Sequence, residues 1–404
     1  MNVFFRLSML VLHVCTLLQT CVCGFRSGKY CSSARDGQED EWSTRTCMYT
    51  NMCYDPAHQK FMYITEEDSE SSLSVSAGPL GNPWGTYQLS IDTMSEQVWR
   101  KVTQSRRVEH LNGVYVIYFS WNAENFGHFV LDELFPIFRA LELFGLEASQ
   151  PLLVRIKASD PNKFEWTCDW MEFKHMTGWA SKCKTNYERL TKLLTSREPV
   201  VLNSTFRSNK IFCFSRIVSG LGLLSDHCED ETRHGRLFIP GFRCNIGVGA
   251  SVWKFRDHAL RQLNVGACIP NELRIVVDCT LSRKRTYPQL SEGVQRLSQY
   301  YNESRPDVVV VGAKLAEMSL KQQLEIISCA AVFISGAGGG AAGATVFLPR
   351  WASAFIAIGS DRRHYDIDFI SRIGYVRVKY IPLFGTLDVK QIDDALTSFI
   401  DLTK

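Results

Sequence analysis

The chain lacks a marked excess of charge of either sign. Its 404 residues include 45 lysines and arginines and 42 aspartates and glutamates, so the formal net charge is only +3. A nucleic-acid-binding protein usually carries a clear basic excess, and nucleic acid is therefore not expected as a partner. Internal repeats and low-complexity tracts are also missing, and 45% of the residues are hydrophobic, as in an ordinary globular protein. Any basic charge that matters for function must be local.

Zinc-finger spacing is absent among the cysteines, so a structural metal site is not expected. The total of 14 cysteines is unusual in a reduced cytosolic enzyme but ordinary in an oxidising compartment. Three lie in an N-terminal leader, which leaves 11, an odd number, and at least one thiol without an intramolecular partner. We expect a bridge among Cys31, Cys47 and Cys53, whereas Cys279 and Cys329 end apolar runs and fit buried thiols.

Long hydrophobic runs are missing except near the N-terminus, where Arg6 precedes the apolar stretch Leu7–Val22. That stretch is on the short side for a membrane span, which needs roughly 20 apolar residues. Residues 1–24 therefore fit a signal peptide or a short signal-anchor. Either one places the rest of the chain in the secretory lumen, in the Golgi apparatus or endoplasmic reticulum. A signal-anchor would also hold the chain at the membrane. Asn203 and Asn302 begin sequons that are acceptable glycosylation sites there.

The length of the chain predicts two domains with an appendage. Residues 25–105 are polar and fit a disulfide-tied N-terminal extension, and residues 106–250 carry the first α/β pattern. Residues 251–404 alternate strands with helices, the order that builds a parallel doubly wound sheet. The expected fold class is therefore α/β, with two Rossmann-like domains that face each other across a cleft.

A titratable pair opens a predicted helix in the first of these domains. His128 and Asp132 are four residues apart in Asn125–Pro136, so they share one helical face. An imidazole held by a carboxylate can act as a base near neutral pH. The alternative is a core histidine bonded to a neighbouring acid.

A glycine-rich turn, Ser335-Gly336-Ala337-Gly338-Gly339-Gly340, follows a predicted strand and opens a helix. Such a turn lets the backbone and the helix N–H groups approach a diphosphate. Its glycines also satisfy the dinucleotide fingerprint, with an acid, Asp361, near the position that binds ribose, so an NAD-linked lumenal oxidoreductase is an alternative. A third possibility is a turn that only packs tightly.

A local basic segment, Ser282-Arg283-Lys284-Arg285, comes directly after the predicted strand 273–277. Ligands of open α/β sheets bind beyond the carboxyl ends of strands, where these cations would neutralise a phosphate. The pair Asp366 and Asp368 has the spacing of a metal-binding motif, but it fits the acidic start of a helix, and no metal site is expected.

Together these residues resemble glycosyltransferase family 61, the relatives of the EGF-domain O-GlcNAc transferase and of plant xylan arabinosyl- and xylosyltransferases. The family has an early block in which an asparagine is followed by a histidine and acids before a proline, and Asn125–Pro136 looks like it. Ser282–Arg285 looks like the family's serine–arginine-rich block after a strand, and Gly336–Pro349 looks like its late loop of small residues. The segment Cys47–Tyr54 is similar to the paired-cysteine opening of the family, which implies disulfide-bonded Cys47 and Cys53.

The resemblance implies a GT-B architecture, with the acceptor on the N-terminal domain and the nucleotide sugar on the C-terminal one. It also implies inverting transfer of N-acetylglucosamine or a pentose from a UDP-sugar to a hydroxyl of a secretory glycoprotein or polysaccharide. His128 would be the base, oriented by Asp132, and no cofactor is required. The residues assigned to the nucleotide sugar are Asn125, Ser282, Arg283, Lys284, Arg285, Ser335, Gly336, Ala337, Gly338 and Gly339. The late loop of the family usually begins with histidine, which is absent here, so a non-catalytic glycan- or nucleotide-binding relative is a further alternative.

Overall fold

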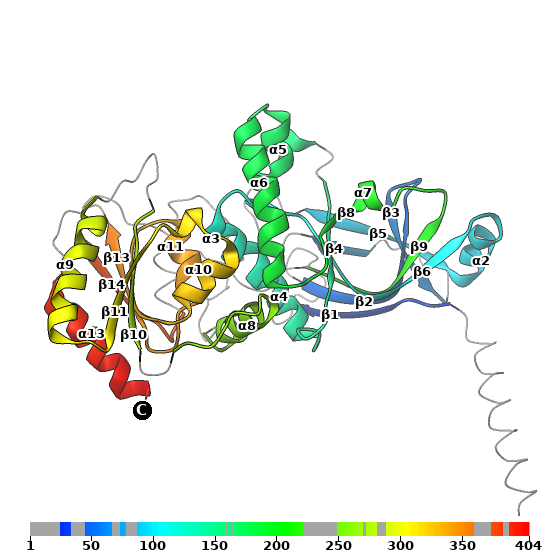
Figure 1. Ribbon diagram of the computed structural model, residues 1–404. Helices are drawn as coiled ribbons and strands as arrows, with labels where there is room; N and C mark the ends of the chain where they lie inside the picture. Colours follow the sequence, from blue (N-terminus) through cyan, green and yellow to red (C-terminus); the bar gives the residue numbers. More distant parts are fainter. Residues whose placement is uncertain are drawn as a thin grey trace, which may run out of the picture.

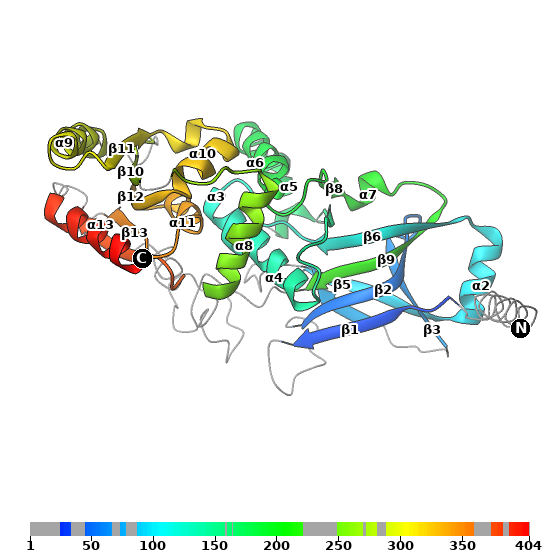
Figure 2. The ribbon, with the colours of Figure 1, turned by 60° about the horizontal axis from the view of Figure 1, so that its bottom comes forward.

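The computed structural model describes residues 25–33, 45–66, 73–77, 87–157, 160–163, 165–220, 249–269, 272–280, 288–358, 373–382 and 388–403. The predicted leader, the basic segment Ser282–Arg285, Asp361 and the pair Asp366 and Asp368 lie outside these ranges. The described residues form two α/β units on either side of helix α8 (Gly249–Gln262), as Figures 1 and 2 show. We call residues 25–220 the N-terminal lobe and residues 272–403 the C-terminal lobe. The mixed α/β class expected from the sequence is confirmed.

The N-terminal lobe is built on a sheet of nine strands in the order β4-β5-β3-β2-β9-β6-β7-β8, with β1 beside β2. Strands β6, β7, β8 and β9 run parallel, and β2 joins them antiparallel through β9. The strands are β1 (Gly28–Ser33), β2 (Arg45–Asp55), β3 (Lys60–Thr65), β4 (Leu73–Ser76), β5 (Gln88–Ser95), β6 (Val108–Tyr118), β7 (Leu152–Arg155), β8 (Val200–Val201) and β9 (Ile211–Gly220). The helices are α2 (Glu96–Ser105), α3 (Phe126–His128), α4 (Phe135–Leu143), α5 (Cys168–Phe173), α6 (Thr177–Leu190) and α7 (Leu202–Thr205).

The predicted N-terminal extension is an integral part of this sheet. Its strand β2 pairs with β9, which comes more than 150 residues later in the chain, so residues 25–105 and 106–220 share one sheet rather than forming separate units. Two disulfides tie β2 to its neighbours: Cys31–Cys47 joins it to β1, and Cys53–Cys213 joins it to β9. Cys47 and Cys53 are thus both disulfide-bonded, each to a different partner.

The C-terminal lobe holds the predicted parallel sheet, with strand order β11-β10-β12-β13-β14. After β10 the chain forms β11 on one side of it and then β12, β13 and β14 on the other, so the sheet is doubly wound. The strands stay parallel, and the strand order reverses between β10 and β12. The strands are β10 (Leu273–Asp278), β11 (Val308–Ala313), β12 (Ala330–Gly336), β13 (Ser353–Ile358) and β14 (Arg377–Pro382). The helices are α9 (Pro288–Ser304), α10 (Leu320–Ile327), α11 (Gly339–Thr345) and α13 (Val389–Thr403).

Both faces of this parallel sheet are covered. Ile275 and Val277 of β10 pack with α9 and α13 in one apolar cluster, whereas Val276, between them, belongs to another cluster. In Figure 1, α9 and α13 lie on the outer face, and α10 and α11 lie on the face toward the N-terminal lobe. This two-sided burial explains why the strands of the lobe are continuous apolar runs in the sequence.

One hydrophobic core extends through both lobes. It contains Val116 and Phe138 of the N-terminal lobe, Phe255 of α8, and Phe333 and Phe347 of the C-terminal lobe. The Phe255 ring is fully buried, and its centroid lies 5.7 Å from Phe135, 5.6 Å from Phe138 and 6.2 Å from Phe347. Helix α8 is therefore a packed bridge rather than a loose linker.

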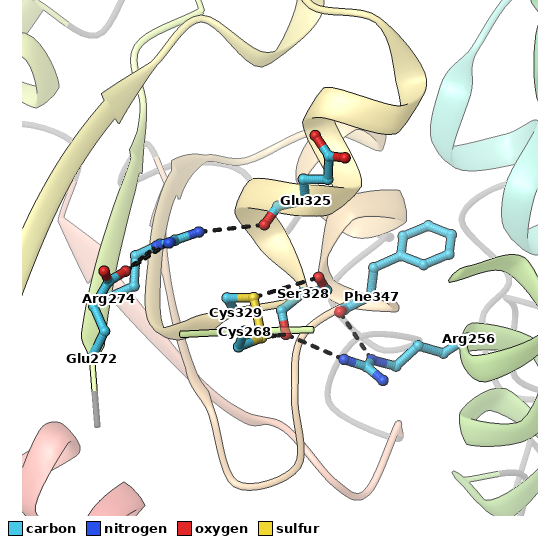
Figure 3. Close-up of a disulfide and its surroundings, with 8 residues drawn as sticks. All are labelled: Arg256, Cys268, Glu272, Arg274, Glu325, Ser328, Cys329 and Phe347. Carbon is cyan, nitrogen blue, oxygen red and sulfur yellow. Dashed lines mark hydrogen bonds and ion pairs between the residues drawn. A yellow bond between two sulfur atoms is a disulfide. The ribbon is translucent and has the colours of Figure 1, made fainter. Parts of the chain in front are cut away.

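Polar contacts also join α8 to the C-terminal lobe (Figure 3). The buried guanidinium of Arg256 donates to the carbonyl oxygens of Phe347 and Ser328, at 3.0 and 3.2 Å. Next to Ser328, Cys329 forms a disulfide with Cys268, which follows α8 in the chain. Cys329 was expected to be a buried thiol, and that expectation was wrong because residues 263–268 return α8 to the start of β12. Among the described residues, Cys279 is the free thiol.

Truncation of Phe255 tests whether the lobes share a core. Phe255→Ala should lower the free energy of unfolding by about 3–5 kcal/mol, because it leaves a cavity among aromatic rings from both lobes. Chemical denaturation followed by tryptophan fluorescence measures this change. Leu143→Ala, at the exposed end of α4, is the control and should change stability by well under half as much. Equal effects of the two substitutions would contradict a shared core.

Candidate functional site

The predicted helix of the His128 motif consists of three consecutive segments. A short α-helical turn, α3, leads into the π-helix η1 (Phe129–Leu134), which continues as α4. Pro136 lacks an N–H group, and in a regular α-helix its ring would clash with the carbonyl group of Asp132. The wider π turn lies directly before this proline, and such turns often occur at functional sites. Gly145, with φ of 64°, ends the helix as predicted.

The structure brings His128 and Asp132 together. Nδ1 of His128 lies 2.6 Å from Oδ2 of Asp132, whose side chain is 1% exposed, while the imidazole is 24% exposed. The Trp121 ring meets the imidazole edge-on, with ring centroids 5.4 Å apart. In the tautomer that donates a hydrogen bond from Nδ1–H to the buried carboxylate, Nε2 is the ring nitrogen that can accept a proton.

Glu133, next to Asp132, is a second buried acid that sequence reasoning missed. Its Oε1 accepts hydrogen bonds from the backbone N–H groups of Trp121 and Asn122, at 3.0 and 2.9 Å. Burial raises the pKa of Glu133 from 4.5 to about 8, against the lowering effect of those N–H groups and of Ser120. The charge of Asp132 raises it further. Glu133 therefore fixes the segment that places Trp121 against His128.

The two predicted motifs meet where the lobes touch. A Cβ atom added to Gly127 would lie 2.6 Å from Cα of Gly339, so backbone rests directly on backbone. A Cβ on Gly339 would overlap the Asn125 side chain, which accepts a hydrogen bond from Gly127 N at the start of α3. A Cβ on Gly343 would lie 2.5 Å from the Phe126 ring. Gly339 and Gly343 are therefore required for packing between the lobes, the third of the possibilities that the sequence left open.

The reversal point of the C-terminal sheet lies beside this contact. Asp278 ends β10 and Ser335 lies near the end of β12, and the Ser335 hydroxyl donates to Oδ2 of Asp278 at 3.2 Å. Oδ1 of Asp278 accepts from the backbone N–H of Thr280 at 3.0 Å. The predicted basic segment begins two residues after Thr280. Ligands of doubly wound sheets bind at this point, beyond the carboxyl ends of the strands.

The other predicted nucleotide-binding residues have distinct environments. Ala337 is buried, and its N–H bonds to the carbonyl of Ala357, so the chain is still part of the sheet there. Gly338 has φ of 151°, a backbone conformation that favours glycine, and it precedes α11. A Cβ atom added to Gly340 would meet no other atom within 4 Å.

The two sequons differ in exposure. Asn302 is exposed on α9. Asn203 is partly buried, and its side-chain oxygen accepts a hydrogen bond from the Tyr54 hydroxyl at 2.6 Å.

Within the described ranges, neither a metal-binding cluster nor a membrane-spanning helix is present. No group of three or more histidine, cysteine, aspartate or glutamate side chains is placed there to hold a metal ion. No helix in the same ranges has the length and apolar character to cross a membrane.

No known family model and no curated sequence matches the chain. Among solved structures, E. coli heptosyltransferase WaaC with ADP has a TM-score of 0.32 and 10% identity, and the match covers 72% of this chain and 100% of that one. WaaC with ADP-2-deoxy-2-fluoro heptose has a TM-score of 0.28 and 11% identity, with 73% and 100% covered. The glycotransferase of kitacinnamycin has a TM-score of 0.24 and 11% identity, with 71% and 67% covered. Identities and TM-scores this low do not define the function of this chain.

The raised pKa of Glu133 predicts a pH-dependent stability difference. Between about pH 4.5 and pH 8 the folded chain keeps a proton on Glu133 that the unfolded chain releases, so this group lowers stability as pH rises through that window. Glu133→Gln removes the titration. Its free energy of unfolding relative to the unmodified chain should therefore increase by a few kcal/mol between about pH 5 and pH 8. Denaturation series over this range measure it, with the exposed Glu172→Gln as control; parallel pH profiles for Glu133→Gln and the unmodified chain would contradict the raised pKa.

Adjacent glycines offer a matched test of the contact between the lobes. Gly339→Ala should destabilise the protein by about 1–3 kcal/mol, because the new methyl group overlaps Asn125. Gly340→Ala, one position later in the same helix, meets open space and should be neutral or slightly stabilising. Thermal unfolding compares the two variants, and the packing explanation fails if Gly339→Ala is tolerated as well as Gly340→Ala.

Proposed function

We propose that this protein is an inverting glycosyltransferase related to family 61, and that it transfers a sugar from a UDP-sugar to a hydroxyl group of a glycan or glycoprotein. One observation carries the proposal: the contact between Gly127 and Gly339 sets the His128–Asp132 pair beside the reversal point of the C-terminal sheet. A base and a nucleotide site from opposite lobes are the two parts that this reaction needs.

In the proposed reaction, Nε2 of His128 accepts the proton of the acceptor hydroxyl as its oxygen attacks the anomeric carbon. Asp132 orients the ring and stabilises the imidazolium that forms. The bond from the anomeric carbon to the diphosphate oxygen breaks on the opposite face, and the nucleoside diphosphate departs. Arg283, Lys284 and Arg285, with N–H groups of Gly338 and Gly339, would stabilise its charge. Protein cations supply that charge, so the reaction as proposed requires no metal.

The disulfides support a place in the lumen of the secretory pathway. Four of them occur among the described residues, and such bonds persist in oxidising compartments. We propose that residues 1–24 direct or anchor the chain there. N-acetylglucosamine and pentoses are the donor sugars to test first.

Replacement of His128 tests the proposed base. His128→Ala should reduce sugar transfer by at least 100-fold, the order expected on loss of a general base, and leave the Kd for UDP nearly unchanged. Donor hydrolysis and transfer are measured with a panel of nucleotide sugars, and UDP binding by calorimetry. His110→Ala, at an exposed position of β6, is the control. Transfer that survives in His128→Ala would eliminate this residue as the base. A thermal shift with nicotinamide cofactors but not with UDP would instead favour the oxidoreductase.

A further inference from the structure

A helical hairpin projects from the N-terminal lobe next to the proposed site. It consists of α5 and α6 and stands out from the body of the protein in Figure 1. The disulfide Cys168–Cys183 joins the two helices. We call residues 165–190 the aromatic hairpin, because several large aromatic side chains lie on its surface.

Exposed tryptophan and phenylalanine side chains are concentrated on this hairpin, whereas the exposed tyrosines, Tyr30, Tyr300 and Tyr380, lie elsewhere. Among the described residues, four tryptophan and phenylalanine side chains are largely exposed, and three belong to the hairpin: Trp166 at 41%, Phe173 at 49% and Trp179 at 44%. The fourth, Trp351 at 39%, lies in the C-terminal lobe. Solvent exposure of large rings is unfavourable, so a cluster of them on one element indicates a surface that binds something.

The rings are held in place rather than loosely displayed. Trp166 has φ of 68°, a conformation that is unfavourable for a non-glycine residue, and its ring centroid lies 5.7 Å from that of Trp170. Lys174 lies over the Phe173 ring at 5.5 Å, and Lys182 over the Trp179 ring at 5.7 Å. The exposed rings of Phe173 and Trp179 therefore each have an ammonium group beside them.

Lys182, whose ammonium group lies over the Trp179 ring, connects the hairpin to the segment before the proposed catalytic helix. Nζ of Lys182 lies 2.8 Å from Oε1 of Glu124, and Nδ2 of Asn186 donates to the Glu124 carbonyl at 2.9 Å. Glu124 directly precedes Asn125, the cap of α3, so these contacts fix the hairpin against the segment that leads to His128. A molecule that lies on Trp179 therefore contacts the helix that holds Glu124, four residues before the proposed base.

The charge of the hairpin favours an uncharged occupant. Residues 165–190 contain four lysines and arginines and four aspartates and glutamates. An anionic membrane surface would call for a cationic excess, and residues 165–190 have none. Sugar rings have apolar C–H faces that stack on aromatic rings and hydroxyl rims that bond to flanking lysine and glutamate side chains.

We propose that the aromatic hairpin binds the acceptor glycan, with neutral sugar rings stacked on Trp179 and Trp166. The assignment of this glycan as acceptor rests on the proposed transferase function, whereas its binding to the hairpin does not. In this arrangement the hairpin holds the glycan chain and presents its terminal hydroxyl toward His128.

Binding of chitotriose, xylotriose and mannotriose to the full chain, measured by calorimetry without nucleotide, tests the proposal. At least one of these neutral probes should bind, and Trp179→Ala should weaken its binding tenfold or more, while Trp179→Phe restores most of it. Trp351→Ala, a tryptophan of similar exposure in the other lobe, should bind like the unmodified chain. Equal melting temperatures would establish that the variants are folded.

The proposal is overturned if none of the three probes binds, or if Trp179→Ala binds as tightly as the unmodified chain. It is also overturned if a deglycosylated protein, but no glycan, binds in a manner that depends on Trp179. Donor hydrolysis in the same variants separates this proposal from the transferase function. Hydrolysis that persists in Trp179→Ala while glycan binding is lost supports both, whereas absent hydrolysis in the unmodified chain with Trp179-dependent glycan binding removes only the transferase.

Discussion

The structure depends on one close approach, the backbone contact of Gly127 with Gly339. Neither position has space for a side chain, and the contact joins the helix that follows β6 to the helix that follows β12. It thereby aligns the carboxyl edges of the two sheets, where the His128 motif and the Asp278–Ser335 pair lie. Phe255 and the rest of the core that the two lobes share stabilise this arrangement. With a common core, large independent motions of the lobes are not expected.

The neighbouring acids Asp132 and Glu133 bind different groups in the N-terminal half of the site. Asp132 engages the imidazole of His128, and Glu133 engages the backbone of the segment 121–122. Both side chains are almost fully buried. In a regular α-helix consecutive side chains point about 100° apart, and the π turn at this position allows both carboxyl groups to be buried. The turn thus couples the orientation of the base to the segment that carries Trp121.

Local sequence patterns predicted the C-terminal lobe well because its strands and helices alternate and each strand is buried on both faces. The His128–Asp132 contact also followed from local spacing. Pairing of β2 with β9 was not predictable in the same way, because it joins residues far apart in the chain and leaves no periodic signal. The disulfide of Cys329 was missed for the same reason.

The roles of individual site residues were harder to predict than their positions. The glycine turn resembles a phosphate-binding loop, yet Gly339 and Gly343 contact the other lobe, and a sequence cannot distinguish close approach to a ligand from close approach to backbone. Glu133 gave one available signal, since it directly follows Asp132 in an otherwise apolar stretch. Asp278 gave another, as the acid that ends a buried strand.

A crystal structure of the protein with bound UDP tests the central claim most directly. The account predicts that the diphosphate lies beyond the carboxyl ends of β10 and β12, within reach of Arg283, Arg285 and the N–H groups of Gly338 and Gly339, with its terminal phosphate directed toward His128. A nucleotide bound elsewhere on the protein, or directed away from His128, would contradict it.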